Sequence, residues 1–349
     1  MKKPSASLPP SIYNISPGGG RRWHGSSFSS PPPAAAAGGA AAVFLAEAVL
    51  AAPRCNTADK RALLQLKKGL GNPYTIITWV AGTDCCRSWY ATECDPSTGR
   101  VTAVVILGME TAGPSRSRRP SSANLTGPLP TEIAKLTRLK MLWMDWNGLT
   151  GPVPAFLGRL AKLEYINLSF NKLSGAIPPS LGDLPQLGAL FLDRNQLTGA
   201  IPEALGKLRQ PDLYIRLSHN NLTGAIPQSF GRLNITKIDL SRNQLTGDAS
   251  VLFAGSGKWT SIDLSRNLLE FDLSKAAAIP NIYSVDLNHN RIYGKIPPEL
   301  NKLENLSFFN VSYNRLCGQI PQGGPLSSLT QYEFFHNRCL CGKPLPPCN

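Results

Sequence analysis

The sequence predicts an α/β solenoid, a right-handed superhelix built from about ten copies of one short repeat. The first observation is an asparagine that recurs at intervals of 23 to 25 residues. It occupies positions Asn147, Asn171, Asn195, Asn220, Asn243, Asn267, Asn290 and Asn314. The second observation is an apolar pattern in register with each asparagine, and the third is a group of cysteines at either end of the repeats. Because no single copy can bury its own apolar residues, the stack of copies must form the core.

One copy, residues 163–184, shows how the pattern specifies structure. Ile166 and Leu168 alternate with polar positions before Asn171, as in a short strand with one buried face. We expect Asn171 to turn inward, where its amide bonds backbone groups that the bend leaves without partners. Gly175 permits the tight turn that follows, and the Ile-Pro pair after it suits an extended segment. The period is that of a leucine-rich repeat, and the Gly-x-Ile-Pro variant resembles the plant-type extracellular repeat.

Two segments before the repeats differ from them in composition. Residues 1–33 are rich in Pro, Ser and Gly and form a low-complexity extension. Residues 34–52 are a short apolar run that ends in small residues, which is typical of the hydrophobic region of a signal peptide. Since the run is short and interrupted by Glu47, it does not suit a transmembrane helix. We therefore expect a secreted protein without a membrane anchor.

Cysteines lie only before the repeats and at their end. They are Cys55, Cys85, Cys86, Cys94, Cys317, Cys339, Cys341 and Cys348. This placement predicts disulfide-stapled caps over residues 53–100 and 322–349, in an oxidising compartment. Each cluster allows three pairings, and we favour the sequential one: Cys55–Cys85, Cys86–Cys94, Cys317–Cys339 and Cys341–Cys348. The two Cys-x-x-Cys pairs of a zinc site are absent from the sequence, and we expect neither a metal nor a cofactor.

The repeats extend over residues 101–321, with one interruption near their start. Residues 114–138 should form the second repeat, but Arg118 and Pro120 occupy the positions of its buried strand residues. Because neither residue suits the buried face of a strand, we interpret this segment as a damaged second repeat. It is either a surface loop or the result of a splicing error, and a basic docking loop is the functional alternative.

Certain strand positions have no packing role in the repeat, and they predict a concave binding face. The early repeats place aromatic side chains there, which are typical anchors of protein interfaces. The predicted partner-binding residues are Trp143, Trp146, Tyr165, Asn167, Phe170, Phe191, Asp193, Arg194, Arg216, His219, Asp239, Arg242, Asp263, Arg266, Asp286 and His289.

Within this set, the middle repeats place two columns of opposite charge side by side. The basic column is Arg194, His219, Arg242 and Arg266, and the acidic column is Asp239, Asp263 and Asp286. Such columns either neutralise each other in water, where exposed ion pairs contribute little, or form a charge-complementary docking surface. The exposed apolar area beside them favours a docking surface.

No pattern in the sequence indicates catalysis. Ser, His and Asp recur on this face because the repeat consensus contains them, and a Gly-x-Ser-x-Gly elbow is absent. Asp239 and Asp263 fall on neighbouring strands, at a separation that could suit a glycosidase, but an open face excludes no water. The net charge of +14 is spread along the chain without aromatics between basic residues. This favours a polyanion such as an acidic polysaccharide over nucleic acid.

Asn-x-Ser/Thr sequons are frequent, partly because the repeat itself generates them. We expect glycosylation at Asn124, Asn221, Asn234 and Asn305. Asn167 and Asn310 fall on the concave face, where a glycan would obstruct docking.

The motifs together resemble plant polygalacturonase-inhibiting proteins, from about Cys55 to Asn349. The strings that carry the resemblance are DKRALLQLKK (59–68), LDRNQLTG (192–199), LSRNLLEFDLSK (264–275), NVSYNRLCGQIP (310–321) and HNRCLCGKPLPPC (336–348). The resemblance implies a secreted plant-defence protein of the cell wall that is not an enzyme. It implies binding and inhibition of fungal endopolygalacturonases through the concave face, and contact with pectin as homogalacturonan.

Two other functions are compatible with the fold. A developmental or receptor-associated protein of this kind would bind a peptide or a receptor ectodomain, and the fold alone does not distinguish it. An ice-binding repeat protein would need a flat array of regularly spaced Thr or Asn, and the mixed charges argue against it.

Overall fold

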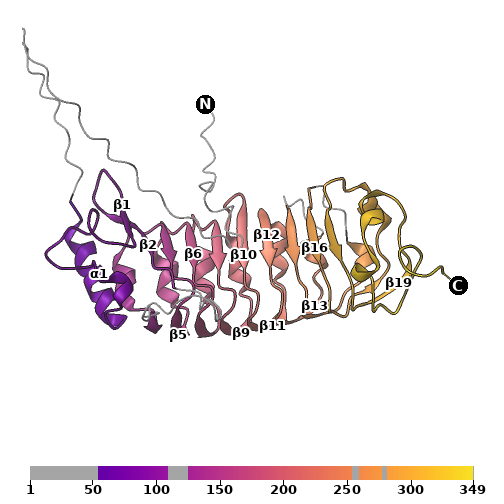
Figure 1. The fold of residues 1–349 in the computed structure, drawn as a ribbon, viewed down its shortest axis with the longest axis horizontal. Helices are drawn as coiled ribbons and strands as arrows, with labels where there is room; N and C mark the ends of the chain where they lie inside the picture. The colour runs from indigo at the N-terminus through magenta and orange to yellow at the C-terminus, as the bar shows by residue number, and fades with distance from the viewer. Residues whose placement is uncertain (1–53, 109–124, 254–258, 277–280, 349) are drawn as a thin grey trace, which may run out of the picture. The chain divides into compact units, whose positions relative to one another are not determined.

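The computed structural model describes most of the repeats and both caps (Figure 1). The described ranges are residues 54–108, 125–253, 259–276 and 281–348. The predicted extension (1–33) and signal-peptide region (34–52) lie outside them, as do Arg118, Pro120 and Asn124. No described helix is both long and apolar enough to span a membrane.

The N-terminal cap contains helix α1 (Thr57–Gly69), drawn in indigo in Figure 1. Asn56 begins the helix, because its side chain accepts hydrogen bonds from two backbone N–H groups of the first turn. Leu63 and Leu66 are fully buried, and α1 packs beside the 3₁₀ helix Thr131–Lys135. The helix therefore shields the apolar end of the stack from water.

An ion pair between a buried carboxylate and a partly exposed arginine joins α1 to the first strands. The carboxylate of Asp59 is fully buried and accepts hydrogen bonds from Arg100 Nε at 2.8 Å and Val101 N at 2.9 Å. Val101 begins β2 (Val101–Val105), which pairs antiparallel with β1 (Thr92–Cys94). One carboxylate thus fixes the helix against the edge of the main sheet.

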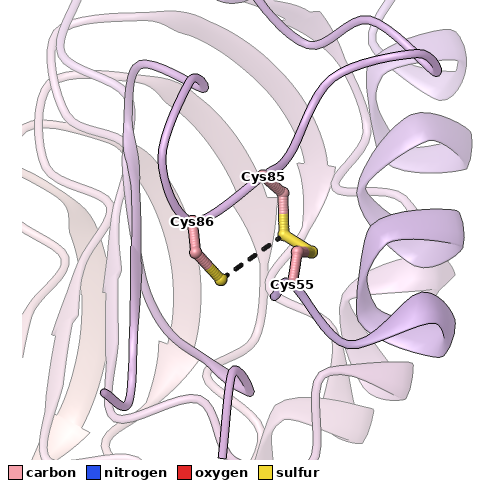
Figure 2. Close-up of side chains that lie close together, drawn as sticks. All are labelled: Cys55, Cys85 and Cys86. Atoms are coloured by element: carbon pink, nitrogen blue, oxygen red, sulfur yellow. Dashed lines mark hydrogen bonds between the residues drawn. A yellow bond between two sulfur atoms is a disulfide. The ribbon is translucent and has the colours of Figure 1, made fainter. Parts of the chain in front are cut away.

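Four disulfides close the two caps. They are Cys55–Cys85 (Figure 2), Cys86–Cys94, Cys317–Cys339 and Cys341–Cys348, in sequential order. In the C-terminal cap, β19 (Arg315–Gln319) and β20 (Cys339–Cys341) lie side by side, and Cys317 is the register partner of Cys339. Both ends of the solenoid are therefore cross-linked.

The largest sheet has ten strands, and all its pairings after β1–β2 are parallel. Following β2, its strands are β4 (Met141–Trp143), β6 (Tyr165–Asn167), β8 (Ala189–Phe191), β10 (Leu213–Arg216), β12 (Ile235–Asp239), β14 (Ser261–Asp263), β16 (Ser284–Asp286) and β18 (Phe308–Asn310). Each repeat supplies one strand, and its middle apolar residue is buried. The predicted leucine-rich repeat solenoid is confirmed.

Two smaller sheets follow the bend of each repeat. The seven-stranded sheet contains β3 (Thr126–Gly127), β5 (Gly148–Pro152), β7 (Lys172–Gly175), β9 (Gln196–Ala200), β11 (Asn221–Ala225), β13 (Gln244–Gly247) and β15 (Leu268–Leu269). The three-stranded sheet contains β17 (Tyr293–Gly294), β19 (Arg315–Gln319) and β20 (Cys339–Cys341).

Short 3₁₀ helices complete the described turns. They span Tyr74–Ile76, Thr131–Lys135, Ala155–Arg159, Pro179–Asp183, Glu203–Lys207, Gln228–Arg232, Ser250–Leu252, Leu273–Lys275, Pro298–Lys302, Gly324–Ser328 and Gln331–Glu333. Six of these eleven start directly after the proline of a Leu-Pro, Val-Pro or Ile-Pro pair, and none exceeds five residues. Segments this short accommodate the tighter 3₁₀ turn, because it needs fewer residues than a full α-helix.

The recurring asparagines form an inward ladder, as predicted. Asn171 donates from Nδ2 to the carbonyls of Met144 and Leu168, and its Oδ1 accepts from Leu149 N at 3.0 Å. The ladder extends one step further than the sequence pattern indicates, since Asn337 makes the same bonds in the C-terminal cap. Every step joins one repeat to the next through a buried or half-buried amide.

The start of the repeats departs from the predicted register. β2 pairs directly with β4, and Asn147 closes this turn by donating to Ile106 O and accepting from Leu125 N. Ile106 and Leu125 are 19 residues apart, whereas the equivalent Met144 and Leu149 are 5 apart. The predicted first and second repeats thus share one turn, with 14 additional residues (19 − 5) between Ile106 and Leu125.

Candidate partner-binding face

The concave face is the side of the ten-stranded sheet that does not face the core. On β14, for example, Ile262 is buried, while its neighbours Ser261 and Asp263 are half-buried on the other side. The predicted partner-binding residues lie on these strands and on the turn that follows each of them. Their environments divide the face into an aromatic end, a charged middle and a second aromatic end.

The residue before each ladder asparagine has a left-handed backbone, with φ between 53° and 57°. This left-handed column comprises Trp146, Phe170, Arg194, His219, Arg242, Arg266, His289, Tyr313 and His336. Such a backbone is costly for residues other than glycine. Hydrogen bonds to the next repeat offset that cost, as when Arg194 N donates to Ser218 O at 2.8 Å. The column side chains are therefore held in fixed order along the face.

Aromatic stacking organises the N-terminal end. The rings of Trp146 and Phe170 stack with centroids 3.7 Å apart, and the Arg194 guanidinium lies 5.0 Å from the Phe170 centroid. Phe191 meets Tyr214 edge to face at 4.8 Å and is only 8% exposed. Trp146 and Phe170 are therefore the better placed of these aromatics to anchor a partner.

Two predicted contact residues serve the structure instead. Asp193 is 1% exposed and accepts hydrogen bonds from Ser169 Oγ at 2.6 Å and Arg216 Nη2 at 2.7 Å. Burial raises the pKa of Asp193, although Arg216 opposes the shift. Asn167 is 6% exposed and bonds Asp145 Oδ2. Since both are almost inaccessible, Asp193 and Asn167 position their neighbours and offer a partner little contact.

The acidic column carries its charge without ion pairs to the basic column. Asp239 accepts hydrogen bonds from Ser218 Oγ and from Ser241 N and Oγ. Asp286 is bonded by Asn288, whereas Asp263 accepts one from Ser265 N at 3.0 Å. Among the described residues, no ion pair joins the two columns. The two columns therefore do not neutralise each other through direct ion pairs.

A hollow of about 380 Å³ lies between the columns and brings most of the predicted charged residues together. Its lining consists of Asp193, Arg194, Arg216, Ser218, His219, Asp239, Ser241, Arg242, Asp263, Ser265, Arg266, Asp286 and Asn288. Burial, followed by the charges of Arg194 and Arg242, lowers the pKa of His219. The lining residues make the hollow polar, with charged side chains on both of its sides.

A second aromatic stack at the C-terminal end is missing from the predicted site. The rings of His289 and Tyr313 stack at 4.1 Å, and those of Tyr313 and His336 at 4.2 Å. Burial and the nearby Arg266 and Arg242 lower the pKa of His289. Tyr313 and His336 each precede a ladder asparagine, so the register that located His289 also identifies them.

Asp145 is a further residue that the predicted site omits. Its Oδ1 and the indole Nε1 of Trp143 are buried and make no hydrogen bond within the described part of the chain. Burial raises the pKa of Asp145 to about 6, while the adjacent indole N–H and Asn167 Nδ2 act in the opposite direction. This position thus holds a carboxyl that accepts a proton easily.

The predicted glycosylation sites within the described ranges are accessible. The side chains of Asn221, Asn234 and Asn305 are exposed, and none lies on the concave face. Asn310 is half-buried on β18, and its Oδ1 accepts hydrogen bonds from Ser312.

The outer face of the seven-stranded sheet differs in chemistry from the concave face. Hydroxyl side chains recur there at Thr126, Thr150, Ser174, Thr198, Thr223 and Thr246, and all but Ser174 are exposed. Lys172 is the one charged residue on the described strands of this sheet. In register, Thr198 lies beside Asn221, and Thr223 lies beside Gln244. The result is a neutral row of hydroxyls and amides.

Comparison with known proteins agrees with this architecture. The family "Leucine rich repeat N-terminal domain" matches residues 56–95, and "Leucine rich repeat" matches residues 137–197. The chain is 42% identical to a plant ice-binding protein of known crystal structure, with a TM-score of 0.72, over 85% of this chain and 99% of that one.

Its curated relatives are more similar still. Polygalacturonase inhibitor 1 of Arabidopsis thaliana is 55% identical over 315 residues, which cover 86% of this chain and 94% of the relative. The polygalacturonase inhibitor of Pyrus communis is 53% identical and covers 84% of this chain and 92% of the relative. The repeats, the capped ends and these identities show that the chain belongs to the polygalacturonase-inhibitor family of plant leucine-rich repeat proteins.

Proposed function

We propose that this protein is secreted to the plant cell wall, where it binds and inhibits fungal endopolygalacturonases and has no catalytic activity of its own. The observation that carries the proposal is the hollow of about 380 Å³ between two columns of opposite charge, which no ion pair among the described residues joins. Charge left unpaired on a face that packing does not dictate is available for a complementary partner.

The basic residues of the hollow and the aromatic residues at the N-terminal end of the face have different roles in this proposal. Arg242 and Arg266 would face the carboxylates of a polygalacturonase cleft and block access of the acidic substrate. Trp146 and Phe170, already stacked on each other, would anchor the N-terminal edge with little loss of conformational freedom. The partner thus meets cations and aromatics in a fixed arrangement.

Inhibition of the enzyme is the direct test. The purified secreted protein is expected to lower the release of reducing sugars from polygalacturonate by several fungal endopolygalacturonases. Heat-denatured protein is the control for non-specific effects of a basic polypeptide. If no enzyme in a broad panel is inhibited by the folded protein, the proposal fails and peptide or receptor binding becomes the better alternative.

We also propose contact with homogalacturonan, which is supported by the net charge of +14. The protein should co-sediment with calcium-gelled polygalacturonate at low salt and be released at high salt, because screening weakens such contacts. Retention on neutral cellulose to the same extent would contradict a charge-based contact.

Ice binding is a second candidate, and the neutral hydroxyl row of the seven-stranded sheet favours it. The mixed charges that argue against this function lie mainly elsewhere, since Lys172 is the one charged residue on the described strands of the seven-stranded sheet. The similarity to a plant ice-binding protein supports it as well. Thermal hysteresis is expected from the wild type and should be lost in a Thr198→Lys/Thr223→Lys variant. A matched control, Ala161→Lys/Gln186→Lys, adds the same charge at other exposed positions; wild-type protein without hysteresis would exclude the candidate.

A further inference from the structure

Exposed cations gather where α1 meets the first two 3₁₀ helices of the repeats, away from the concave face. Lys135 and Arg159 are the last residues of these two 3₁₀ helices, and Arg138 and Lys162 each follow three residues later. All four side chains are exposed. Because the two 3₁₀ helices contact each other, the four cations occupy equivalent places in neighbouring repeats.

Helix α1 adds two more cations to this group. Lys135 Nζ donates a hydrogen bond to Gln65 Oε1 at 2.8 Å, which joins the group to the helix. Arg61 and Lys68 lie four residues before and three residues after Gln65, so they share its face of the helix. Both are exposed. The six cations together are called the cap patch: Arg61, Lys68, Lys135, Arg138, Arg159 and Lys162.

The cap patch carries a local excess of positive charge. None of its six cations takes part in an ion pair within the described ranges. Glu132 is the one acidic residue of the two 3₁₀ helices. Glu164, two residues after the patch, is already paired with Lys140 at 3.2 Å. The positive charge of the patch is therefore available to an external anion.

The same side of later repeats has acidic residues among its cations. In the next repeat the equivalent position is Asp183, which pairs with Lys207 at 2.9 Å. Near the C-terminal cap, Lys302 has Glu299 in its own 3₁₀ helix and Glu304 two residues further on. The cap patch differs from these repeats in its unbalanced charge.

Several cations in neighbouring repeats suit a polymer that carries its negative charges at short intervals. A single exposed ion pair contributes little, so only a ligand that engages several of these cations at once is held. Strands of neighbouring repeats lie about 4.8 Å apart, and this interval also separates the repeats that supply the cations. Homogalacturonan has one carboxylate on each sugar ring and can therefore meet several of the cations together.

We propose that the cap patch is the site at which this protein holds carboxylated wall polysaccharide, while the concave hollow stays open to its enzyme partner. The inference rests on the proposed contact with homogalacturonan and assigns that contact a place on the molecule. Because the patch and the hollow share no residue, the polymer and the enzyme do not compete for the same cations. The wall polymer then retains the inhibitor where the enzyme acts.

Two variants of the full secreted protein test the site. The patch variant is Arg138→Gln/Arg159→Gln/Lys162→Gln. The control variant, Lys275→Gln/Lys295→Gln/Lys302→Gln, removes the same charge at other exposed positions. Binding to calcium-gelled polygalacturonate should weaken at least about fivefold in the patch variant and no more than about twofold in the control. Equal losses in both would overturn the proposal, because net charge alone would then explain the binding.

The remaining outcomes separate this site from the proposed function. If the wild type does not bind polygalacturonate, the proposed contact with homogalacturonan fails and the site fails with it. If the wild type binds and the patch variant binds equally well, only the site is wrong. Inhibition of an endopolygalacturonase should be the same in the patch variant and the wild type, which shows that the variant is folded.

Chemical cross-linking gives a measurement that needs no substitution. A carbodiimide joins a carboxylate of an oligogalacturonate to a lysine amine as an amide, and the reagent takes up the water that is lost. Peptide mapping should locate the sugar on Lys68, Lys135 and Lys162. Fully methyl-esterified oligomers, which are neutral, are the control for labelling without a carboxylate. Cross-links mainly at Lys295 and Lys302 would overturn the proposal.

Discussion

Asp263 on β14 lies directly beside Asp239 on β12, and the two carboxylates accept unequal numbers of hydrogen bonds. Asp239 accepts three, from Ser218 Oγ and from Ser241 N and Oγ, whereas Asp263 accepts one from Ser265 N. Burial and then the charge of Asp239 raise the pKa of Asp263 to about 6. The charge of the acidic column therefore changes in mildly acidic solution.

This relationship predicts how stability depends on pH. A carboxyl whose pKa is raised from 3.8 to about 6 on folding binds more protons in the folded than in the unfolded state between these values. Stability should therefore rise as the pH falls from 7 to 5. Asp263→Asn should flatten this slope and add about 1–2 kcal/mol to the free energy of unfolding at pH 7.

Urea unfolding followed by circular dichroism at pH 5 and pH 7 measures the effect. Asp183→Asn is the matched control, because Asp183 is exposed on the opposite side and pairs with Lys207. Its effect should be small and equal at both pH values. An unchanged pH slope in Asp263→Asn would show that this carboxyl does not titrate differently on folding.

The basic column should determine partner binding more than stability. Arg242→Ala with Arg266→Ala is expected to weaken binding to an inhibited endopolygalacturonase at least about tenfold, since both cations line the hollow without an ion-pair partner among the described residues. Arg159→Ala with Arg232→Ala removes the same charge from exposed 3₁₀ helices. Surface plasmon resonance compares the affinities of the two double variants. An equal loss of affinity in both would show that the effect comes from net charge alone.

The asparagine ladder should be essential for stability. Asn195→Ala removes a buried amide that accepts from Leu173 N and donates to Leu168 O, Leu192 O and Asp193 O. Leaving these backbone groups without partners should lower the free energy of unfolding by about 2–4 kcal/mol. Chemical denaturation gives the value, with exposed Asn221→Ala as the control. If Asn195→Ala lowers the free energy of unfolding no more than Asn221→Ala does, the ladder does not stabilise the stack.

The buried carboxylate of the N-terminal cap should be equally sensitive. Asp59→Ala leaves Arg100 and Val101 N without their acceptor, and breaking a buried pair in this way costs about 3–5 kcal/mol. Hydrogen exchange should show the loss first in α1 and β2. Uniform destabilisation along all repeats would indicate that the cap does not unfold separately.

The sequence was sufficient to predict the solenoid because its signal is periodic. Asn171 and its equivalents fix both the ladder and the strand register. Asn337 was not recognised as a ladder residue because Phe334 occupies the position three residues before it, where the other repeats have a non-aromatic apolar residue. Its distance of 23 residues from Asn314 does fit the pattern. The pairing of β2 with β4 at the start of the repeats could not be predicted, because residue counts alone do not show which strands are neighbours.

The concave face was only partly predictable. The register correctly places Arg242 and Asp263 at the hollow, but it treats every repeat alike. The exposure of Asp193 depends on Arg216 and Ser169 from neighbouring repeats, and the missing ion pairs between the columns depend on side-chain reach. Such properties arise between repeats and cannot be inferred from any single one.

The left-handed column limits how this surface can diversify. Its nine residues are aromatic, Arg or His, and none is β-branched, since Val, Ile or Thr would be severely strained at positive φ. A library that retargets the protein should therefore vary this column only among unbranched side chains. Branched residues belong on the adjacent strand positions, where an extended backbone favours them. The fold thus determines which residue types can be used for recognition at each position.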